Sequence, residues 1–592
     1  MKQGKILLTL SMSLLLTSLT GCSGEKNIKY VSVLGENEDG EIKPAEKEIG
    51  LYFKDNNEIP YISIQDGFDY LSAFKAARFN DKENKEHYYR VSKDGENYVV
   101  TEEHNKKVTF DVPKQTITYD DMDTFCDLLG SSESVPLATL TLSGKEKSIK
   151  TISKTFTPGN AVTIDLNNYS VLDLVKYNDK LYIPLATFND CFINTYGVSN
   201  LAYNYQSLYV VPNGGLVDPL FGQLSTLGES FFNGPKRNKL SKELLDYNYQ
   251  ETCLNFDYFY GLKKEKGYTN FDTFINQKGF KNDFYSEDIK KVDDALSLTL
   301  SHLVDGHSGA SINSTFYPFG EISHDKSREN ADRKAWAEGS DSFQKSRSEK
   351  AKTDPTAALG NYGDETGKTY YIGFDSFAPL NEALLYDKSE YEDKRTINTQ
   401  TAMQFQAAYQ ELTSAANAGK YKNVVVDLST NDGGSSDAMI YALSVLVGNV
   451  QTSSINPLTG AKASVTYKAD INLDGKVDSN DISLADKGFN IVFLDSKYTF
   501  SCGNAMPFIA KTSNSKVMTI GEKSGGGACA VRNVNTAIAS TYMASSLTTI
   551  ATKQGETYVS VETGIAADHT IDEASMFDRL FISTMVNSWI GE

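Results

Sequence analysis

The strongest constraint on the fold is an alternation of strand and helix patterns in the second half of the chain. Short apolar runs predict strands, and apolar positions at helical spacing predict helices. They follow one another as strand 369–374, helix 399–415, strand 423–428, helix 438–447, strand 490–494 and strand 516–520. Such alternation is typical of βαβ units, which form a largely parallel sheet flanked by helices. The sequence therefore predicts an α/β domain here.

The chain is too long for a single hydrophobic core. With 592 residues, it should divide into two or three folded units. Residues 49–212 contain short apolar runs separated by Asn, Asp and Gly, which predicts a β-rich N-terminal domain. Glycine and proline cluster just after residue 212 and interrupt regular structure. A second domain is therefore expected over residues 216–592, with a helical start at 216–306.

Two segments of the β-rich region are alike. Residues 55–66 and 177–190 each contain a polar turn, a short apolar strand with a proline, and a further apolar stretch. They resemble the small repeats of copper-amine-oxidase N-terminal-like domains, which occur as appendages of bacterial surface proteins. The resemblance implies adhesion or positioning rather than catalysis.

Two further predictions concern residues 286–357. Apolar residues at helical spacing from Ile289 to Leu303 predict a helix with Ser286 as its N-cap. Residues 321–357 are polar and charged with almost no apolar period, which predicts a solvated surface loop, with a lid as the alternative.

The N-terminus has the pattern of a secreted lipoprotein. Lys2 and Lys5 precede an apolar run that ends in Leu-Thr-Gly-Cys at Cys22. This ending resembles the bacterial lipobox, which implies that residues 1–22 hold a signal peptide and that Cys22 carries acyl chains on the extracytoplasmic face of the cell membrane. A plain signal or a short anchor helix is the alternative. The polar segment 23–48 predicts a flexible tether.

Charge and cysteine content exclude two classes of protein. The net charge of −19, without a compact Lys/Arg stripe, argues against a nucleic-acid partner. Five cysteines remain beside the lipobox one, and none has metal-ligand spacing, so no disulfide framework is expected. A bridge between Cys502 and Cys529 stays open.

Four stretches combine a reactive side chain with suitable backbone geometry. His307 follows a helix end, where an imidazole can accept a proton near neutral pH, although a lone histidine is more often structural. A buried strand runs into Gly433 and Gly434, whose N–H groups can approach a substrate oxygen. A mere tight turn is the alternative there.

The third stretch places Ser501 just before a helix. Pro507 is tolerated in a helix's first turn, which predicts a helix start near residue 503 or 504 and puts the serine hydroxyl beside free N–H groups. The fourth stretch has a carboxylate, Glu562, followed by a glycine turn. By itself it does not indicate a function.

Together these stretches resemble the C-terminal processing protease and tricorn-core superfamily, whose catalytic domains have a crotonase-like α/β fold. The resemblance covers roughly residues 216–592, and its most specific parts are the strand into "NDGG" and "YTFSCGN" followed by "VMTIGEKSGGG". It implies that Ser501 is the nucleophile of a serine peptidase. It also implies an oxyanion hole made by the N–H groups of Cys502 and of Gly433 or Gly434.

The general base follows the tricorn branch of that superfamily. The dyad lysine of the other branch is absent, since Lys523 is out of register. His307 and Glu562 match the tricorn histidine and glutamate, but Gly306 stands where tricorn has an assisting serine. Ser308 or a water is therefore expected to bridge Glu562 and His307.

Residues 470–481 follow the spacing of an EF-hand loop and resemble dockerin calcium loops. The expected ligands are the side-chain oxygens of Asp470, Asn472, Asp474 and Asp481, the carbonyl of Lys476 and a water-mediated contact of Asp478. An unmetallated turn is the alternative. Because dockerins pair two such loops, the single loop implies a structural Ca²⁺ in an insertion at 465–489 rather than cellulosome docking.

These observations predict a membrane-tethered endopeptidase that cleaves peptides or surface proteins. The main alternative is a binding or scaffold lipoprotein that kept the peptidase fold without catalysis, because the lysine and the assisting serine are missing. An esterase with the same acyl chemistry is a third reading.

Overall fold

The computed structural model describes residues 27–590 with short gaps. The gaps are 38, 46, 55–56, 80, 82–87, 131–134, 143, 218–221, 321, 323–324, 365–367, 515 and 556. The predicted signal peptide and Cys22 lie outside the described residues. Among the described helices, none combines the length and apolar character that a bilayer crossing needs.

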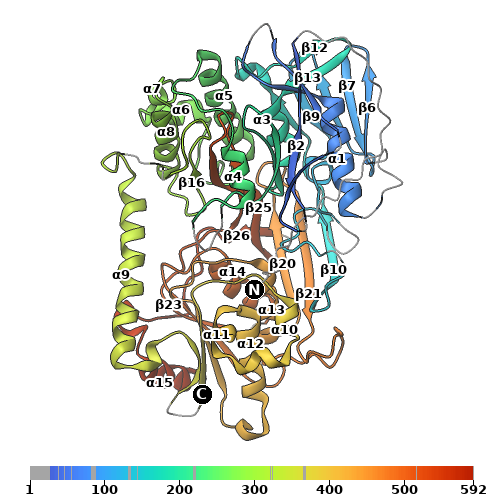
Figure 1. The fold of residues 1–592 in the computed structure, drawn as a ribbon. Helices are drawn as coiled ribbons and strands as arrows, with labels where there is room; N and C mark the ends of the chain where they lie inside the picture. Colours follow the sequence, from blue (N-terminus) through green and yellow to red (C-terminus); the bar gives the residue numbers. More distant parts are fainter. Residues whose placement is uncertain are drawn as a thin grey trace.

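The molecule has two lobes, one above the other in Figure 1. The lower lobe is built on a six-stranded sheet in the order β17-β18-β19-β22-β23-β27. Its strands are β17 (Gly360–Gly363), β18 (Thr369–Gly373), β19 (Asn423–Asp427), β22 (Asn490–Asp495), β23 (Met518–Gly521) and β27 (His569–Thr570). All neighbours are parallel except β17 with β18. The predicted parallel α/β sheet is confirmed.

Helices cover both faces of this sheet, because its buried strands alternate apolar side chains between them. Val424 and Val426 pack toward α12, α13 and α14, whereas Val425 packs toward α9 and α15. These helices are α12 (Thr401–Thr413), α13 (Ser436–Val447), α14 (Cys502–Ser513), α9 (Ala331–Thr353) and α15 (Arg579–Ile590). Shorter helices are α10 (Glu382–Leu385) and α11 (Lys394–Thr399).

A seven-stranded sheet joins the lobes. Its order is β10-β21-β20-β25-β16, with β24 and β26 also paired to β25. The strands are β10 (Ile149–Thr157), β16 (Gly309–Ile312), β20 (Val450–Ile455), β21 (Lys462–Ala469), β24 (Cys529–Asn535), β25 (Thr541–Gln554) and β26 (Thr557–Ser560). The long strand β25 runs between the two lobes in Figure 1.

The upper lobe holds three further sheets and the first helices. The sheets are β1-β4-β5-β13-β12, β11-β9-β8-β7-β6 and β14-β15-β2-β3. The strands are β4 (Ile49–Tyr52), β5 (Tyr61–Ser63), β6 (Tyr89–Asp94), β7 (Asn97–Glu102), β8 (Lys107–Asp111), β9 (Thr116–Tyr119), β11 (Val162–Asp165), β12 (Val175–Tyr177), β13 (Lys180–Pro184), β14 (Ser199–Tyr203) and β15 (Leu208–Pro212). The helices are α1 (Ile64–Arg78), α2 (Met122–Phe125), α3 (Leu185–Phe188), α4 (Thr226–Phe232), α5 (Lys242–Phe259), α6 (Phe271–Gln277), α7 (Lys281–Phe284) and α8 (Ile289–Ser301).

The two similar segments form matching units. Strand β5 leads directly into α1, and β13 leads directly into α3. The two strands pair antiparallel with Ile62 opposite Ile183, both fully buried. The internal likeness read from the sequence therefore has a structural counterpart.

The tether prediction is wrong for the described part of residues 23–48. That part contains β1 (Ile28–Val31), β2 (Val33–Glu36) and β3 (Ile42–Pro44). Val31 and Val33 are buried, and Leu34 and Ile42 are partly buried against a second hydrophobic cluster, so a few side chains hold these short strands in place. One hydrophobic cluster reaches from Val31 through α5 and α8 to Leu547, so packing is continuous across the boundary expected near residue 212.

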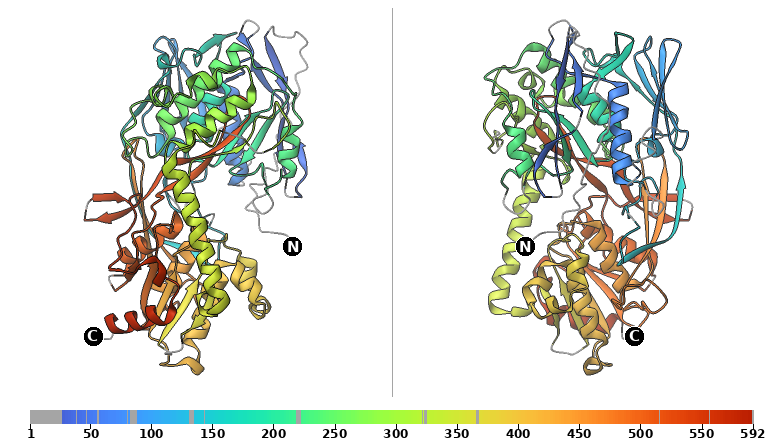
Figure 2. Two further views of the ribbon diagram at one scale, coloured as in Figure 1. Left: turned by 90° about the vertical axis from the view of Figure 1, so that its left-hand side faces the viewer. Right: turned by 45° about the vertical axis from the view of Figure 1, so that its right-hand side comes forward.

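The solvated loop predicted at 321–357 is wrong, because α9 occupies 23 of these residues. Asn330 caps the helix, and only Phe343 and Arg347 are buried. Figures 1 and 2 show α9 running along the side of the molecule from the upper to the lower lobe. A helix that packs through so narrow a stripe leaves no apolar period to detect.

The N-cap of α8 is Asp288, whose side chain accepts the Lys290 N–H, and not Ser286 as predicted. Ser286 instead accepts the Asp288 N–H at 3.1 Å.

Candidate active site

Ser501 lies on a sharp turn between β22 and α14. Its φ of 54° and ψ of −124° are rare for a residue with a side chain. Two backbone bonds hold the turn, from the Ser501 N–H to Gly526 O and from the Phe500 N–H to Asn431 O, each at 2.9 Å. The helix begins at Cys502, one residue before the predicted start, and Pro507 therefore falls in its second turn. A strained turn that presents a hydroxyl at a helix start is typical of nucleophilic serines.

The glycine pair after β19 lies directly against this serine. A Cβ on Gly433 would be 2.5 Å from Ser501 Cβ, 2.9 Å from its Oγ and 3.0 Å from the Cys502 nitrogen. The Gly433 N–H already donates to Asn431 Oδ1 at 3.0 Å. Gly434 is exposed with a φ of 128°. Of the two glycines, Gly434 is therefore the better partner for Cys502 in an oxyanion hole.

His307 is buried beside the serine loop. Its ring lies 4.8 Å from the Phe500 ring, measured between centroids. Neither ring nitrogen has a hydrogen-bond partner among the described residues. Burial lowers the pKa of His307, and the negative charge of Asp305 opposes this shift. The imidazole is therefore neutral at physiological pH and able to accept a proton.

The Phe500 ring separates the histidine and serine loops. Its Cζ lies 2.5 Å from the position of a Cβ on Gly306 and 2.6 Å from one on Gly527. A side chain at either position would collide with the ring. This contact gives the physical reason for Gly306 where the resembling family has a serine.

Glu562 lies on the other side of the serine turn. Its Oε2 accepts the Ala528 N–H at 2.8 Å, and its backbone oxygen touches Gly526, the residue that accepts the Ser501 N–H. Burial raises the pKa of Glu562 to about 7, and the charge of Asp305 adds to the shift. Glu562 makes no hydrogen bond to His307 within the described ranges.

Sequence reasoning missed Asp305, the buried carboxylate of the histidine turn. Its carboxylate accepts hydrogen bonds from the backbone N–H of His307 at 3.0 Å and from the hydroxyls of Ser308 at 2.6 Å and Ser545 at 2.9 Å. The expectation that Ser308 bridges Glu562 and His307 is therefore wrong. The signal available in the sequence was the position of Asp305, two residues before the histidine.

Neither Lys523 nor the residue after it can act as the dyad lysine of the other branch. Lys523 is exposed, whereas the buried Ser524 donates its hydroxyl to Asn504 and accepts the Ile565 N–H. The five described cysteines, including Cys502 and Cys529, are free and buried, so the bridge between those two is not formed.

A cavity of about 360 Å³ lies next to residues 374–378, the segment that contacts the glycine loop. The Phe377 N–H donates to Gly433 O at 2.7 Å, which fixes the adjoining segment against this loop. The lining includes Gly360, Phe374, Asp375, Thr401 and Gln404. It lies at the carboxyl end of β18, and ligands of α/β sheets bind at the carboxyl ends of the strands.

In the predicted calcium loop, backbone N–H groups donate hydrogen bonds to the loop's own aspartates. Asp470 accepts the N–H groups of Asp474 and Gly475, at 3.2 and 2.7 Å, and Asp481 accepts the Ile471 N–H at 2.7 Å. Gly475 has the positive φ, 82°, that the sixth position needs. Burial raises the pKa of Asp470, and the charge of Asp481 contributes. In the described part of the chain, neither carboxylate forms a salt bridge.

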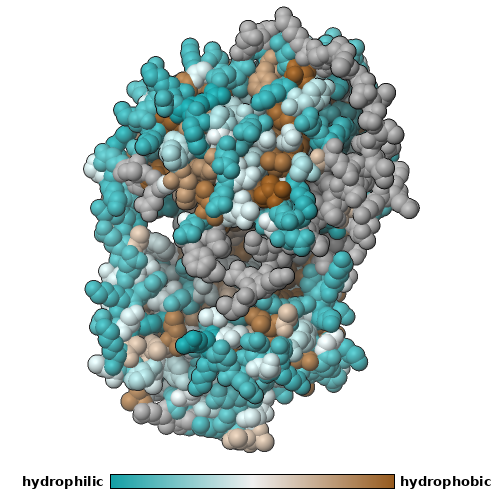
Figure 3. Space-filling view, viewed as in Figure 1, coloured by the Kyte–Doolittle hydropathy of each residue, from teal (hydrophilic) through white to brown (hydrophobic). Residues whose placement is uncertain are grey.

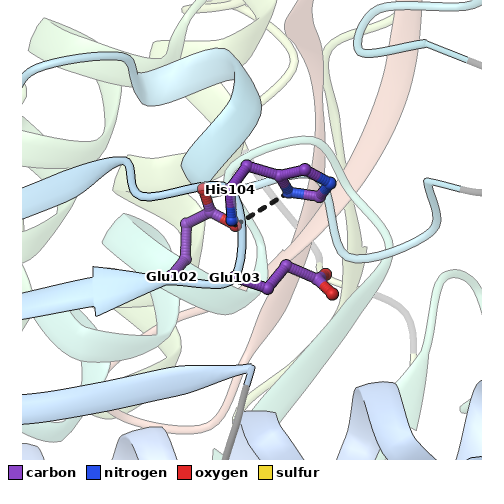
Figure 4. A group of neighbouring side chains, drawn as sticks. All are labelled: Glu102, Glu103 and His104. Carbon is purple, nitrogen blue, oxygen red and sulfur yellow. Dashed lines mark hydrogen bonds and ion pairs between the residues drawn. The ribbon is translucent and has the colours of Figure 1, made fainter.

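A second group of potential ligands lies far from the serine, at the tip of a hairpin. Glu102, Glu103 and His104 have ligand atoms within 4.8 Å of one another, as Figure 4 shows. Glu102 already accepts the backbone N–H groups of His104 and Lys106, and Lys75 pairs with Glu103 at 2.5 Å. These internal contacts account for the arrangement.

One segment of the lower lobe matches a family model. Residues 371–571 match the model of peptidase family S41. The matched S41 segment contains the parallel sheet, the glycine loop, the Ser501 turn and Glu562. It supports a peptidase α/β fold and serine peptidase chemistry for this part of the chain, whereas His307 precedes the segment.

Whole-chain comparisons give only distant likenesses. No curated protein matches the chain. It is similar to the photosystem II D1 C-terminal processing protease, with 18% identity and a TM-score of 0.24 over 35% of this chain and 42% of that one. A lipoprotein from Streptococcus agalactiae has 14% identity and a TM-score of 0.32, over 58% of this chain and 94% of that one. The tricorn protease has 15% identity and a TM-score of 0.22, over 38% of this chain and 18% of that one. At such scores, no function follows from these likenesses.

Proposed function

We propose that this protein is a serine endopeptidase with Ser501 as nucleophile and His307 as general base. The observation that carries the proposal is the contact of Ser501 with Gly433 on a strained turn at the start of α14. In this proposal, the backbone N–H groups of Cys502 and Gly434 form the oxyanion hole beside the hydroxyl. The crotonase-like arrangement implied by the family resemblance is part of the same proposal.

The reaction follows from the chemistry of these groups. Ser501 Oγ attacks the peptide carbonyl while His307 takes its proton, and the N–H groups of Cys502 and Gly434 stabilise the oxyanion. His307 then protonates the leaving amine, and water hydrolyses the acyl-enzyme by the same steps. Because its ring packs on Phe500 and has no polar partner, His307 must turn toward the serine when substrate binds. The cavity next to residues 374–378 has room for a substrate side chain.

A fluorophosphonate probe tests the proposal, because it reacts with activated serines only. The wild type should be labelled, whereas Ser501→Ala and His307→Ala should lose labelling by about 100-fold or more. Since burial lowers the pKa of His307, labelling should persist until the pH falls below about 6.5. Peptide and ester substrates then separate a peptidase from an esterase.

An unlabelled but folded wild type would contradict the enzyme and favour the scaffold reading. One observation motivates that alternative, because the His307 nitrogens lack hydrogen-bond partners in the described structure.

The proposal extends to the site of action. The lipobox resemblance at Cys22 supports a chain that is anchored by lipid on the extracytoplasmic face of the cell membrane. Its substrates are then peptides or proteins at the cell surface.

The proposal also includes a structural calcium ion at residues 470–481. Asp470, Asn472, Asp474, Lys476 and Asp481 would hold it, and its positive charge would offset two buried carboxylates that have no basic partner. It has no part in the peptidase reaction.

Removing calcium with a chelator should lower the melting temperature by about 5 °C or more, and added calcium should restore it. The variant Asp481→Asn should melt at the same temperature with and without chelator. An unchanged melt of the wild type, with no calcium heat in calorimetry, would eliminate the ion.

A further inference from the structure

A single stripe of α9 contacts all three loops of the proposed site. The contacting residues are Arg333, Trp336, Gly339, Phe343 and Arg347. Their spacing of three or four residues places them on one helix face. Most of the rest of α9 is exposed and polar. The helix therefore touches the molecule through these contacts and not through a broad apolar face.

Arg333 binds the turn that carries His307. Its Nη1 donates to the carbonyl oxygens of Ser308 at 2.5 Å, Leu300 at 3.3 Å and Asp305 at 3.5 Å. These acceptors lie at the end of α8 and on both sides of the histidine. A guanidinium that satisfies carbonyls at a helix C-terminus is electrostatically favourable. Burial lowers the pKa of Arg333, but the charge of Asp305 opposes the shift.

The histidine turn needs such support because its backbone is strained. Val304 has a φ of 50°, which is rare and strained for a β-branched residue. Its carbonyl is held by Lys266 Nζ at 2.9 Å, and its side chain is exposed. Without contacts from outside the turn, the backbone would relax and move His307.

The same helix also holds the serine and glycine loops. Trp336 donates from Nε1 to Lys497 O at 3.4 Å, and its ring lies 6.0 Å from the Phe500 ring. Arg347 binds Asp427 at 2.7 Å, at the end of the strand that leads to the glycine pair. Arg333 and Trp336 are one turn apart, so the two halves of the site are tied together over a short length of helix.

We propose that Arg333 is a positioning residue, and that α9 is a brace that fixes the His307 turn relative to the Ser501 loop. This inference rests on the proposed function of the same site. Because no polar partner orients the imidazole in the described structure, its place is set by the turn and by the Phe500 ring. The guanidinium acts through that turn and does not touch the reacting atoms.

The test compares full-length Arg333→Met with the wild type by the rate of fluorophosphonate labelling at Ser501 across pH. Methionine keeps the apolar stem and removes all three hydrogen bonds. Labelling should slow by about 10- to 100-fold, since small displacements of a catalytic group have effects of this size. The pH midpoint should rise toward the ordinary histidine value of about 6.5, because a loosened turn lets water reach the buried ring.

The matched control is Lys345→Met, which removes one positive charge from an exposed position of the same helix. It should label like the wild type. Arg333→Lys keeps one donor and should give an intermediate rate, which preserves the test if the methionine variant does not fold. Wild-type rates and an unchanged midpoint in both folded Arg333 variants would overturn the inference. Failure of the wild type itself to label would instead overturn the proposed function.

Discussion

Replacing Gly433 with alanine should reduce peptide hydrolysis by at least about 100-fold, because the new methyl group would displace Ser501 and the Cys502 N–H, and misplacing one oxyanion donor has an effect of this size. The new methyl group would lie 2.5 Å from Ser501 Cβ and 2.9 Å from Oγ, so the serine turn must shift. The φ of 105° adds backbone strain in the alanine variant. The loss should appear mainly in kcat, because the displaced groups act on the transition state.

The control for Gly433→Ala is Gly419→Ala. Gly419 also has a positive φ, 74°, but a Cβ there meets nothing within 4 Å. It measures the strain of a left-handed alanine without the collision. Steady-state kinetics and the melting temperature are measured for both variants. Normal turnover by a folded Gly433→Ala protein would show that the glycine loop has no part in catalysis.

The largest stability loss is expected for Asp427→Asn, at about 3–5 kcal/mol of unfolding free energy. Asp427 is fully buried at the end of β19, where Arg347 and Arg579 both bind the same carboxylate oxygen. Burial alone would raise the pKa of Asp427, but the two guanidinium groups hold it well below its usual range. Asparagine would leave the buried Arg579 without a counter-charge and Arg347 with only the more distant carboxylate of Asp375, at 3.7 Å.

The stabilisation by Asp427 should depend on pH in a definite direction. A depressed pKa in the folded state means that the stabilisation is present above the unfolded value of about 3.9 and is lost as the pH falls further. The difference between Asp427→Asn and wild type should therefore stay constant from about pH 5 to 8. Urea unfolding measures it, with the exposed Asp341→Asn as control. Equal stabilities would mean that the three-residue cluster is not a determinant of the lower lobe.

The sequence predicted the parts of the fold that depend on local pattern. Strands such as β19 and β22 are uninterrupted apolar runs buried on both faces, and this composition is readable without a structure. The serine turn was predictable to within one residue because Pro507 restricts the backbone and is tolerated only near a helix start. The glycine pair was predictable because glycine permits the positive φ of a sharp turn.

Contacts between distant segments were beyond prediction. Nothing local to Phe500 shows that its ring fills the space between Gly306 and Gly527. The helix α9 was missed because two of its anchors are arginines, which are ordinarily solvated and count against burial. The strands at residues 28–44 were missed because β1 and β2 bury one side chain each and β3 buries none.

Strand β10 has a consequence for how the polypeptide reaches its native state. It lies about 300 residues before its partner β21 in the chain, and it covers that strand from Thr157 opposite Lys462 to Ile149 opposite Ala469, next to the first aspartate of the calcium loop. A polypeptide lacking everything before residue 216 would leave β21 as a bare sheet edge, open to pairing with other molecules. The half that carries the proposed site thus depends on the N-terminal half to cover this sheet edge, and completion of the sheet must await the pairing of these remote segments.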